Sequence, residues 1–149
     1  MRDLPPDHDD ARGLTRFLRQ LERLKSLRRT GWRDRGVPRD EIESVADHTL
    51  RVAVLAWLTA EAAAKRGASI DPNRVLQLAL VHDLAEALAG DLPPYDPDAL
   101  PSIDDAAARR AFLDRRHRRA PARDAAKRAA EERALDEMTD ELPDDLRRL

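Results

Sequence analysis

The sequence contains no cysteine, which excludes disulfide bonds, thiol nucleophiles and thiolate metal ligands together. Aromatic residues make up only 3% of the chain, so a core must be built mainly from leucine, valine and alanine. No apolar run is long enough to span a bilayer, and the opening MRDLPPDHDDARG lacks the apolar stretch of a signal peptide. We therefore expect a soluble, cytoplasmic protein without a membrane partner, in which nitrogen and oxygen atoms hold any metal.

An excess of one charge is also missing, because 27 basic and 29 acidic residues leave a net charge of −2. This balance creates no overall field for holding nucleic acid or an anionic membrane. The run RRHRRAPAR (115–123) could contact phosphates, but acidic residues surround it and no aromatic residue is interleaved. We interpret the run as a solvated helix face or loop, and we expect no nucleic-acid partner.

The spacing of apolar residues is helical throughout, and 149 residues suit one domain with a single core. The sequence has no run of alternating β-branched residues that would predict a strand. The sequence therefore predicts an all-α fold, a compact helical bundle over 14–149 preceded by a flexible polar tail over 1–13. Helices are expected over 14–27, 44–66, 71–90, 104–119 and 121–142, and a long ordered loop over 29–44. The helix over 71–90 is apolar on most sides, which is typical of a helix buried in a bundle.

Ionisable residues interrupt this apolar helix in the stretch LALVHDLAEALAGDLPP (78–94). His82 and Asp83 are neighbours, and Glu86 follows about one helical turn later. Burying such groups is costly unless a charge or a metal compensates them. Imidazole and carboxylate ligands suit Mn²⁺, Fe²⁺, Co²⁺, Ni²⁺ or Zn²⁺. His48 lies near the start of the preceding helix and could complete a site if the two helices pack together.

Each residue also has a simpler interpretation. His48 could be a core histidine bonded to a backbone carbonyl, Glu86 could be an exposed helix residue, and Asp91 could form a turn after Gly90. The combination favours a metal site, because all of them lie in the most apolar helices of a chain otherwise rich in surface charge.

Three blocks in this order, RTGW (29–32), ESVADHTLRVAVLA (43–56) and LALVHDLAEALAGDLPP, resemble the HD-domain metal-dependent phosphohydrolases. Within that family the chain is similar to the 5′-deoxynucleotidase branch. The resemblance implies that His48, His82 and Asp83 ligate the metal. It also implies that Glu86 positions or deprotonates the attacking water, and that Asp91 assists protonation or substrate orientation.

The same resemblance places Arg29 and Trp32 against the phosphate and sugar of a nucleotide. A guanidinium pairs bidentately with phosphate, and an indole offers a flat apolar surface. Trp32 is equally compatible with a core or interface anchor. The implied reaction is hydrolysis of a (deoxy)ribonucleoside 5′-monophosphate to nucleoside and phosphate, with a divalent metal ion. The alternatives are a non-catalytic HD-like protein that binds a nucleotide or a protein partner, and a hydrolase for cyclic or triphosphate nucleotides.

In the family that the chain resembles, a fourth ligand, an aspartate, comes from a helix further downstream. That helix would begin about where this sequence ends, so we expect the chain to lack the family's last helices. Four aspartates are open substitutes: Asp136, Asp140, Asp144 and Asp145. His117 is disfavoured, because the arginines around it repel a cation. Three ligands with weaker metal affinity, a truncated product, or a site completed by a partner subunit all remain open. A short bundle leaves apolar surface uncovered, so we also expect a homodimer.

Overall fold

Helices and turns make up the computed structural model, which describes residues 8–148 and contains no strand within them. The elements are α1 (His8–Leu21), η1 (Glu22–Lys25), α2 (Thr30–Asp34), α3 (Val45–Lys65), α4 (Pro72–Val81), α5 (Glu86–Ala89), η2 (Pro97–Ala99), α6 (Ala106–Leu113), α7 (Pro121–Thr139) and η3 (Leu146–Arg148). The predicted all-α fold is confirmed. Over the described residues, no helix has both the length and the hydropathy needed to cross a membrane.

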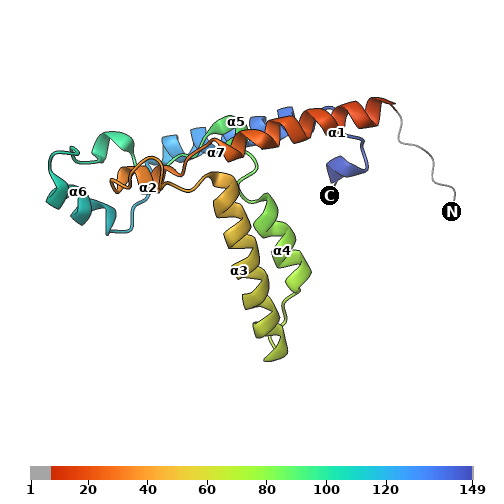
Figure 1. Ribbon diagram of the computed structural model, residues 1–149, viewed down its shortest axis with the longest axis horizontal. Coiled ribbons are helices and arrows are strands. Elements are labelled where there is room, and N and C mark those ends of the chain that lie inside the picture. The colour runs from red at the N-terminus through yellow and green to blue at the C-terminus, as the bar shows by residue number, and fades with distance from the viewer. Residues whose placement is uncertain (1–7, 149) are drawn as a thin grey trace.

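The helices fall into two parts, as Figure 1 shows. In one part, α1, α5 and α7 lie side by side, with α2 and α6 toward one end. In the other, α3 and α4 pack along each other as a hairpin that projects away from this layer. The expectation that the apolar α4 is buried in a bundle is therefore wrong, since Leu78 and Val81 are 52% and 50% exposed. Among the described residues, α4 packs mainly against α3.

The core lies where the first turn of α3 meets the layer. Leu24, Val45, Ala87 and Met138 form its buried centre, and they come from η1, α3, α5 and α7. Partly buried apolar residues surround this centre: Phe17, Leu21, Leu27, Ala46, Leu84 and Leu88. Because α3 and α5 both contribute to this core, packing fixes the elements that carry His48 and Glu86.

Local signals explain where the two hairpin helices begin. Ser44 caps α3, because its hydroxyl accepts from the backbone nitrogen of Asp47 while the Asp47 carboxylate accepts from the backbone nitrogen of Ser44. Asp71 caps α4 by accepting from the backbone nitrogen of Asn73 at 2.9 Å, and Pro72 occupies the first turn. Both helix starts are as the sequence predicts.

The first helix departs from the prediction, because α1 begins at His8 rather than at Leu14. The predicted tail is therefore wrong for 8–13, whereas 1–7 lie outside the described residues. Gly13 lies within α1, at a point where a side chain would overlap the backbone carbonyl of Glu141. Glycine thus permits α1 to approach the chain segment just after α7, a long-range contact that stabilises a helix with polar residues at its start.

Two other segments also differ from the prediction. The short helix α2 forms inside the predicted loop over 29–44, and the helix expected over 104–119 is confined to Ala106–Leu113. On α7, the large apolar Leu135 is 41% exposed, whereas its neighbour Ala134 is buried. A shift of one residue turns the buried face of a helix by about 100°.

Candidate active site

Two short extended segments pair beside the start of α3. The backbone nitrogen of Val45 donates to the carbonyl oxygen of Leu27 at 2.8 Å, and that of Arg29 donates to the carbonyl oxygen of Glu43 at 3.1 Å. These bonds form a small antiparallel bridge. The bridge holds the RTGW block next to the first turn of α3, so two sequence motifs that are 14 residues apart share one wall of the site.

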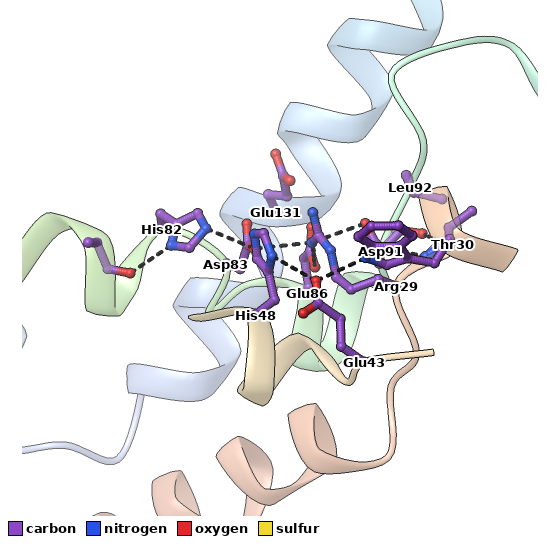
Figure 2. A network of polar contacts seen from close by, with 12 residues as sticks. Arg29, Thr30, Glu43, His48, His82, Asp83, Glu86, Asp91, Leu92 and Glu131 are labelled. Carbon is purple, nitrogen blue, oxygen red and sulfur yellow. Dashed lines mark hydrogen bonds and ion pairs between the residues drawn. The ribbon is translucent and has the colours of Figure 1, made fainter. Parts of the chain in front are cut away.

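The three predicted metal ligands lie together, as Figure 2 shows. His82 Nε2 is 3.0 Å from Asp83 Oδ2, and His48 Nε2 is 3.9 Å from the same oxygen. One ligand atom from each of the three residues lies within 4.8 Å of the others. A divalent cation with ligands at roughly 2.0–2.2 Å fits among atoms this close. The donor set of two imidazoles and one carboxylate also fits such a cation.

A fourth ligand does not join this group among the residues that the structure describes. None of the four aspartates considered from the sequence is part of it, and Asp140 pairs with Arg16 at 3.4 Å instead. His117 lies in an aromatic cluster, stacked on Phe112 with ring centroids 3.9 Å apart. The described part of the chain therefore brings the three predicted ligands together without a fourth.

His82 and Asp83 occupy a turn and not the middle of a long helix. α4 ends at Val81 and α5 begins at Glu86, so the predicted single helix over 71–90 is wrong between these points. Inside the turn the Glu86 backbone nitrogen donates to the carbonyl oxygen of Asp83 at 3.1 Å. This bond joins residues three apart, as in a 3₁₀ helix, and closes a tighter turn than the four-residue bond of an α-helix. The break lets α4 follow α3 while α5 packs against α7.

Hydrogen bonds orient both imidazole rings. His82 Nδ1 lies 2.7 Å from the carbonyl oxygen of Ala79, and His48 Nδ1 lies 3.2 Å from Glu43 Oε1. Assigning the ring proton to Nδ1 satisfies both acceptors, and it leaves each Nε2 with a lone pair on the side of Asp83. This is the arrangement that metal-binding histidines adopt, with the second nitrogen donating to an acceptor outside the metal site.

A single guanidinium nitrogen joins three carboxylates beside the histidines. Arg29 Nη1 lies 3.1 Å from Asp83 Oδ2, 3.3 Å from Glu86 Oε2 and 3.4 Å from Asp91 Oδ1. The side chains of Glu86 and Asp91 are each only 8% exposed. Arg29 therefore supplies the positive charge that buried carboxylates require.

Asp91 is fixed to the RTGW block by two further bonds. Its Oδ2 accepts from the backbone nitrogen of Thr30 at 2.6 Å, and its carbonyl oxygen accepts from the Thr30 hydroxyl at 2.7 Å. Gly90 precedes it with φ +83°, a conformation that glycine adopts without strain. The turn after α5 thus directs Asp91 toward Thr30 on α2. Asp91 bonds the RTGW block through Oδ2, while its other carboxylate oxygen, Oδ1, still faces Arg29 in the site.

The pKa of Glu86 is raised from its ordinary value to about 8. Burial is the largest cause, and the negative charges of Asp91 and Asp83 add to it. The positive charges of Arg29 and Lys127 act in the opposite direction and are outweighed. A carboxyl group with a pKa close to neutral can both accept and release a proton, which is a property of general acid–base residues.

Trp32 lies on the surface of α2 and is 46% exposed, so its interpretation as a core residue is wrong. Its indole Nε1 donates to Glu43 Oε1 at 3.0 Å. Burial alone raises the pKa of Glu43, but the hydrogen bonds from Trp32 and His48 and the charge of Arg51 outweigh it and lower that pKa. Glu43 is therefore a carboxylate held in its ionised form.

A cleft of about 680 Å³ opens over these residues. Its lining includes five of the seven predicted site residues: Arg29, Trp32, His48, Glu86 and Asp91. Sequence reasoning missed the other charged side chains that line it, which are Arg35, Glu43, Arg51, Arg119 and Lys127. Glu43 and Arg51 could have been found from the sequence, because they stand five residues before and three residues after His48, inside the block that resembles the family.

Comparison with known proteins gives a consistent result. The chain matches the family described as HD domain over residues 21–149. The chain belongs to the HD-domain family. A 5′-deoxynucleotidase HDDC2 from Mus musculus is 45% identical over 84 residues, which are 56% of this chain and 38% of that protein. The 5′-deoxynucleotidase YGK1 of Saccharomyces cerevisiae is 41% identical over 81 residues, or 54% of this chain and 34% of that protein.

A solved structure is also similar to this chain. A conserved hypothetical protein from Pyrococcus furiosus is 31% identical, with a TM-score of 0.54, and the match covers 84% of this chain and 64% of that one. The chain thus spans little more than a third of the length of the curated relatives it matches. The predicted resemblance to the HD-domain family and to its 5′-deoxynucleotidase members is confirmed.

Proposed function

We propose that the chain is a metal-dependent phosphohydrolase, which cleaves the phosphomonoester of (deoxy)ribonucleoside 5′-monophosphates to nucleoside and phosphate. The observation that carries this proposal is that three predicted ligand side chains, two further carboxylates and one guanidinium meet beside a single cleft, whose lining includes Arg29, His48, Glu86 and Asp91. Relatives named 5′-deoxynucleotidase support the choice of a nucleoside monophosphate as substrate.

His48, His82 and Asp83 would hold the divalent cation through the two Nε2 atoms and one carboxylate oxygen. A cation at this position favours deprotonation of water and offsets the negative charge of the phosphoryl oxygens. Nitrogen and oxygen ligands of this kind suit Co²⁺, Mn²⁺, Fe²⁺, Ni²⁺ or Zn²⁺, and we propose that one of these is the native metal.

The two remaining carboxylates handle protons. Glu86 follows the ligand His82 by four residues and contacts the same Arg29 nitrogen as Asp83. This position allows it to accept a proton from the attacking water. Asp91 lies on the far side of that nitrogen, where it can donate a proton to the leaving oxygen or orient the substrate. The separation of the two carboxylates by a cation allows them to act in opposite directions.

Arg29 and Trp32 would bind the substrate from α2 and the segment before it. Arg29 uses one nitrogen for the carboxylates, and its planar guanidinium presents further donors that match phosphate geometry. Trp32 exposes an indole at the cleft, which offers an apolar surface for a sugar or a base. Arg51, Arg119 and Lys127 add positive charge around the same cleft.

The decisive experiment incubates the purified chain with a panel of deoxyribonucleoside 5′-monophosphates and Co²⁺ or Mn²⁺ and measures released phosphate. We expect metal-dependent release, and we expect His82→Ala to reduce it by at least about a hundredfold, because the cation supplies several kcal/mol. His117→Gln is the matched control, since this histidine lies in the aromatic cluster outside the site. Equal rates for the wild type and His82→Ala would leave the non-catalytic alternative.

We also propose that the protein forms a homodimer through the α3–α4 hairpin. Four large apolar side chains form a stripe along α3 at helical spacing and are at least 39% exposed: Leu50, Val54, Trp57 and Leu58. Leu78 and Val81 extend the apolar surface onto α4. A surface of this kind is typical of a protein interface, and a second copy offers an identical apolar stripe.

A further inference from the structure

Glu43 stands at the junction of the two motifs and is fixed there by its backbone. Its carbonyl oxygen accepts from the backbone nitrogen of Arg29, and the next residue, Ser44, caps α3. Its side chain is only 14% exposed. Backbone pairing and the helix cap therefore fix the position from which this side chain extends into the site.

One oxygen of that carboxylate contacts two rings from different elements. Glu43 Oε1 lies 3.0 Å from Trp32 Nε1 on α2 and 3.2 Å from His48 Nδ1 on α3. The other oxygen, Oε2, accepts from Arg51 at 2.7 Å. A carboxylate oxygen has two lone pairs, so it can accept both ring N–H groups at once.

These contacts have different consequences for the two rings. Donation from Nδ1 selects the His48 tautomer whose Nε2 carries a lone pair toward Asp83. Trp32 is nearly half exposed, and its bond to Glu43 holds an indole that would otherwise be free to change rotamer. The same atom thus sets the ligand atom of one residue and the ring plane of the other.

We infer that Glu43 is a positioning residue that couples the nucleotide-facing Trp32 to the metal ligand His48. This inference rests on the proposed function, since it gives Trp32 and His48 their roles. It goes beyond that function because one carboxylate then orients both a substrate-binding residue and a metal ligand. Arg51 supports it by holding the second oxygen, so that Oε1 faces the rings.

The first test needs no metal. The ¹⁵N spectrum of the imidazoles in the metal-free chain should show His48 protonated at Nδ1, and Glu43→Ala should shift it toward the Nε2-protonated form. The chain has two tryptophans, so Trp57→Phe leaves Trp32 as the sole indole fluorophore. In that background, Glu43→Ala should move the Trp32 emission to longer wavelength. An unchanged tautomer together with an unchanged emission would overturn the inference.

The second test measures Co²⁺ affinity by calorimetry. Glu43→Ala should weaken binding about 10- to 100-fold, as expected for loss of the acceptor behind a ligating histidine. Glu43→Gln keeps an acceptor without the charge and should lose less. Glu41→Ala removes the same charge two residues away, from an exposed position, and should bind Co²⁺ like the wild type. Circular dichroism checks folding, and Glu43→Gln carries the test if Glu43→Ala unfolds.

The outcomes separate the two proposals. A wild-type chain that fails to bind Co²⁺ would contradict the proposed metal site, while the tautomer and fluorescence measurements would still decide the role of Glu43. A wild-type chain that binds Co²⁺, with Glu43→Ala binding equally well, would overturn the coupling and leave the metal site intact.

Discussion

The two halves of α3 lie in different surroundings. Its first turn is buried among η1, α5 and α7, with Val45 fully inaccessible and His48 facing a polar site. Its later turns belong to the projecting hairpin, where Leu55 and Leu58 are 68% and 54% exposed. The same apolar spacing thus runs through two environments. Only the first supplies enough partners to position side chains for chemistry, and the second presents a surface.

The largest effect should come from charging the exposed half of α3. Val54→Glu combined with Leu58→Glu places two carboxylates on the apolar stripe, and each should cost at least about 2 kcal/mol of association free energy. Together they should weaken self-association by roughly a thousandfold or more, since every 1.4 kcal/mol is a factor of about ten. Sedimentation equilibrium measures this, with circular dichroism to check the fold.

Ala68→Glu, in the connection between α3 and α4, adds the same charge away from the stripe and should leave association unchanged. A wild-type chain that is monomeric at high concentration would contradict the proposed dimer directly.

Next to the buried first turn of α3, Glu86→Gln on α5 tests the energetic cost of the buried carboxyl group. Because the folded-state pKa of Glu86 is about 8, above its ordinary value, the folded metal-free chain binds this proton more tightly than the unfolded chain. Stability is therefore lost as pH rises from about 4.5 toward 8, on the order of 3 kcal/mol by pH 7. Glutamine resembles the protonated acid, so the variant should lack this loss.

Denaturant unfolding of both proteins in EDTA at pH 5 and pH 7.5 measures the difference. The variant should be the more stable protein at pH 7.5 and the less active one with Co²⁺. Parallel pH profiles for the two proteins would contradict the raised pKa.

The smallest effect on stability is expected at the N-terminal cap of α3, where the helix joins the preceding chain. Ser44→Ala removes the cap of α3 and should lower the free energy of unfolding by about 1 kcal/mol. Ser26→Ala is the control, because this hydroxyl bonds only the carbonyl of Arg23 at an exposed position. Equal unfolding free energies for the two variants would show that the cap does not hold the helix start.

The sequence was sufficient for the all-α fold and for the convergence of the predicted ligands. Repeated apolar spacing shows where most helices lie, and His48, His82 and Asp83 stand out as polar residues within apolar stretches of the sequence. The break between α4 and α5 could not be predicted, because the residues there continue to favour a helix. It depends on α5 and α4 having different neighbours.

Long-range contacts account for the other differences. The start of α1 has polar residues, and this helix lies against Glu141 at an approach that Gly13 permits. The pair of ring contacts made by Glu43 also depends on a long-range contact. Its partners Trp32 and His48 are 11 residues before it and five residues after it, and only the pairing of 27–29 with 43–45 brings them together.

The guanidinium of Arg29 has a consequence for how the cleft comes into being. Three carboxylates within residues 83–91 repel one another, and a protein without an internal counter-ion would have to wait for a ligand before bringing them close. Arg29 provides that counter-ion from within the chain. The pocket can therefore assemble as part of ordinary folding, and an arriving phosphate meets acidic groups already drawn around a shared positive centre.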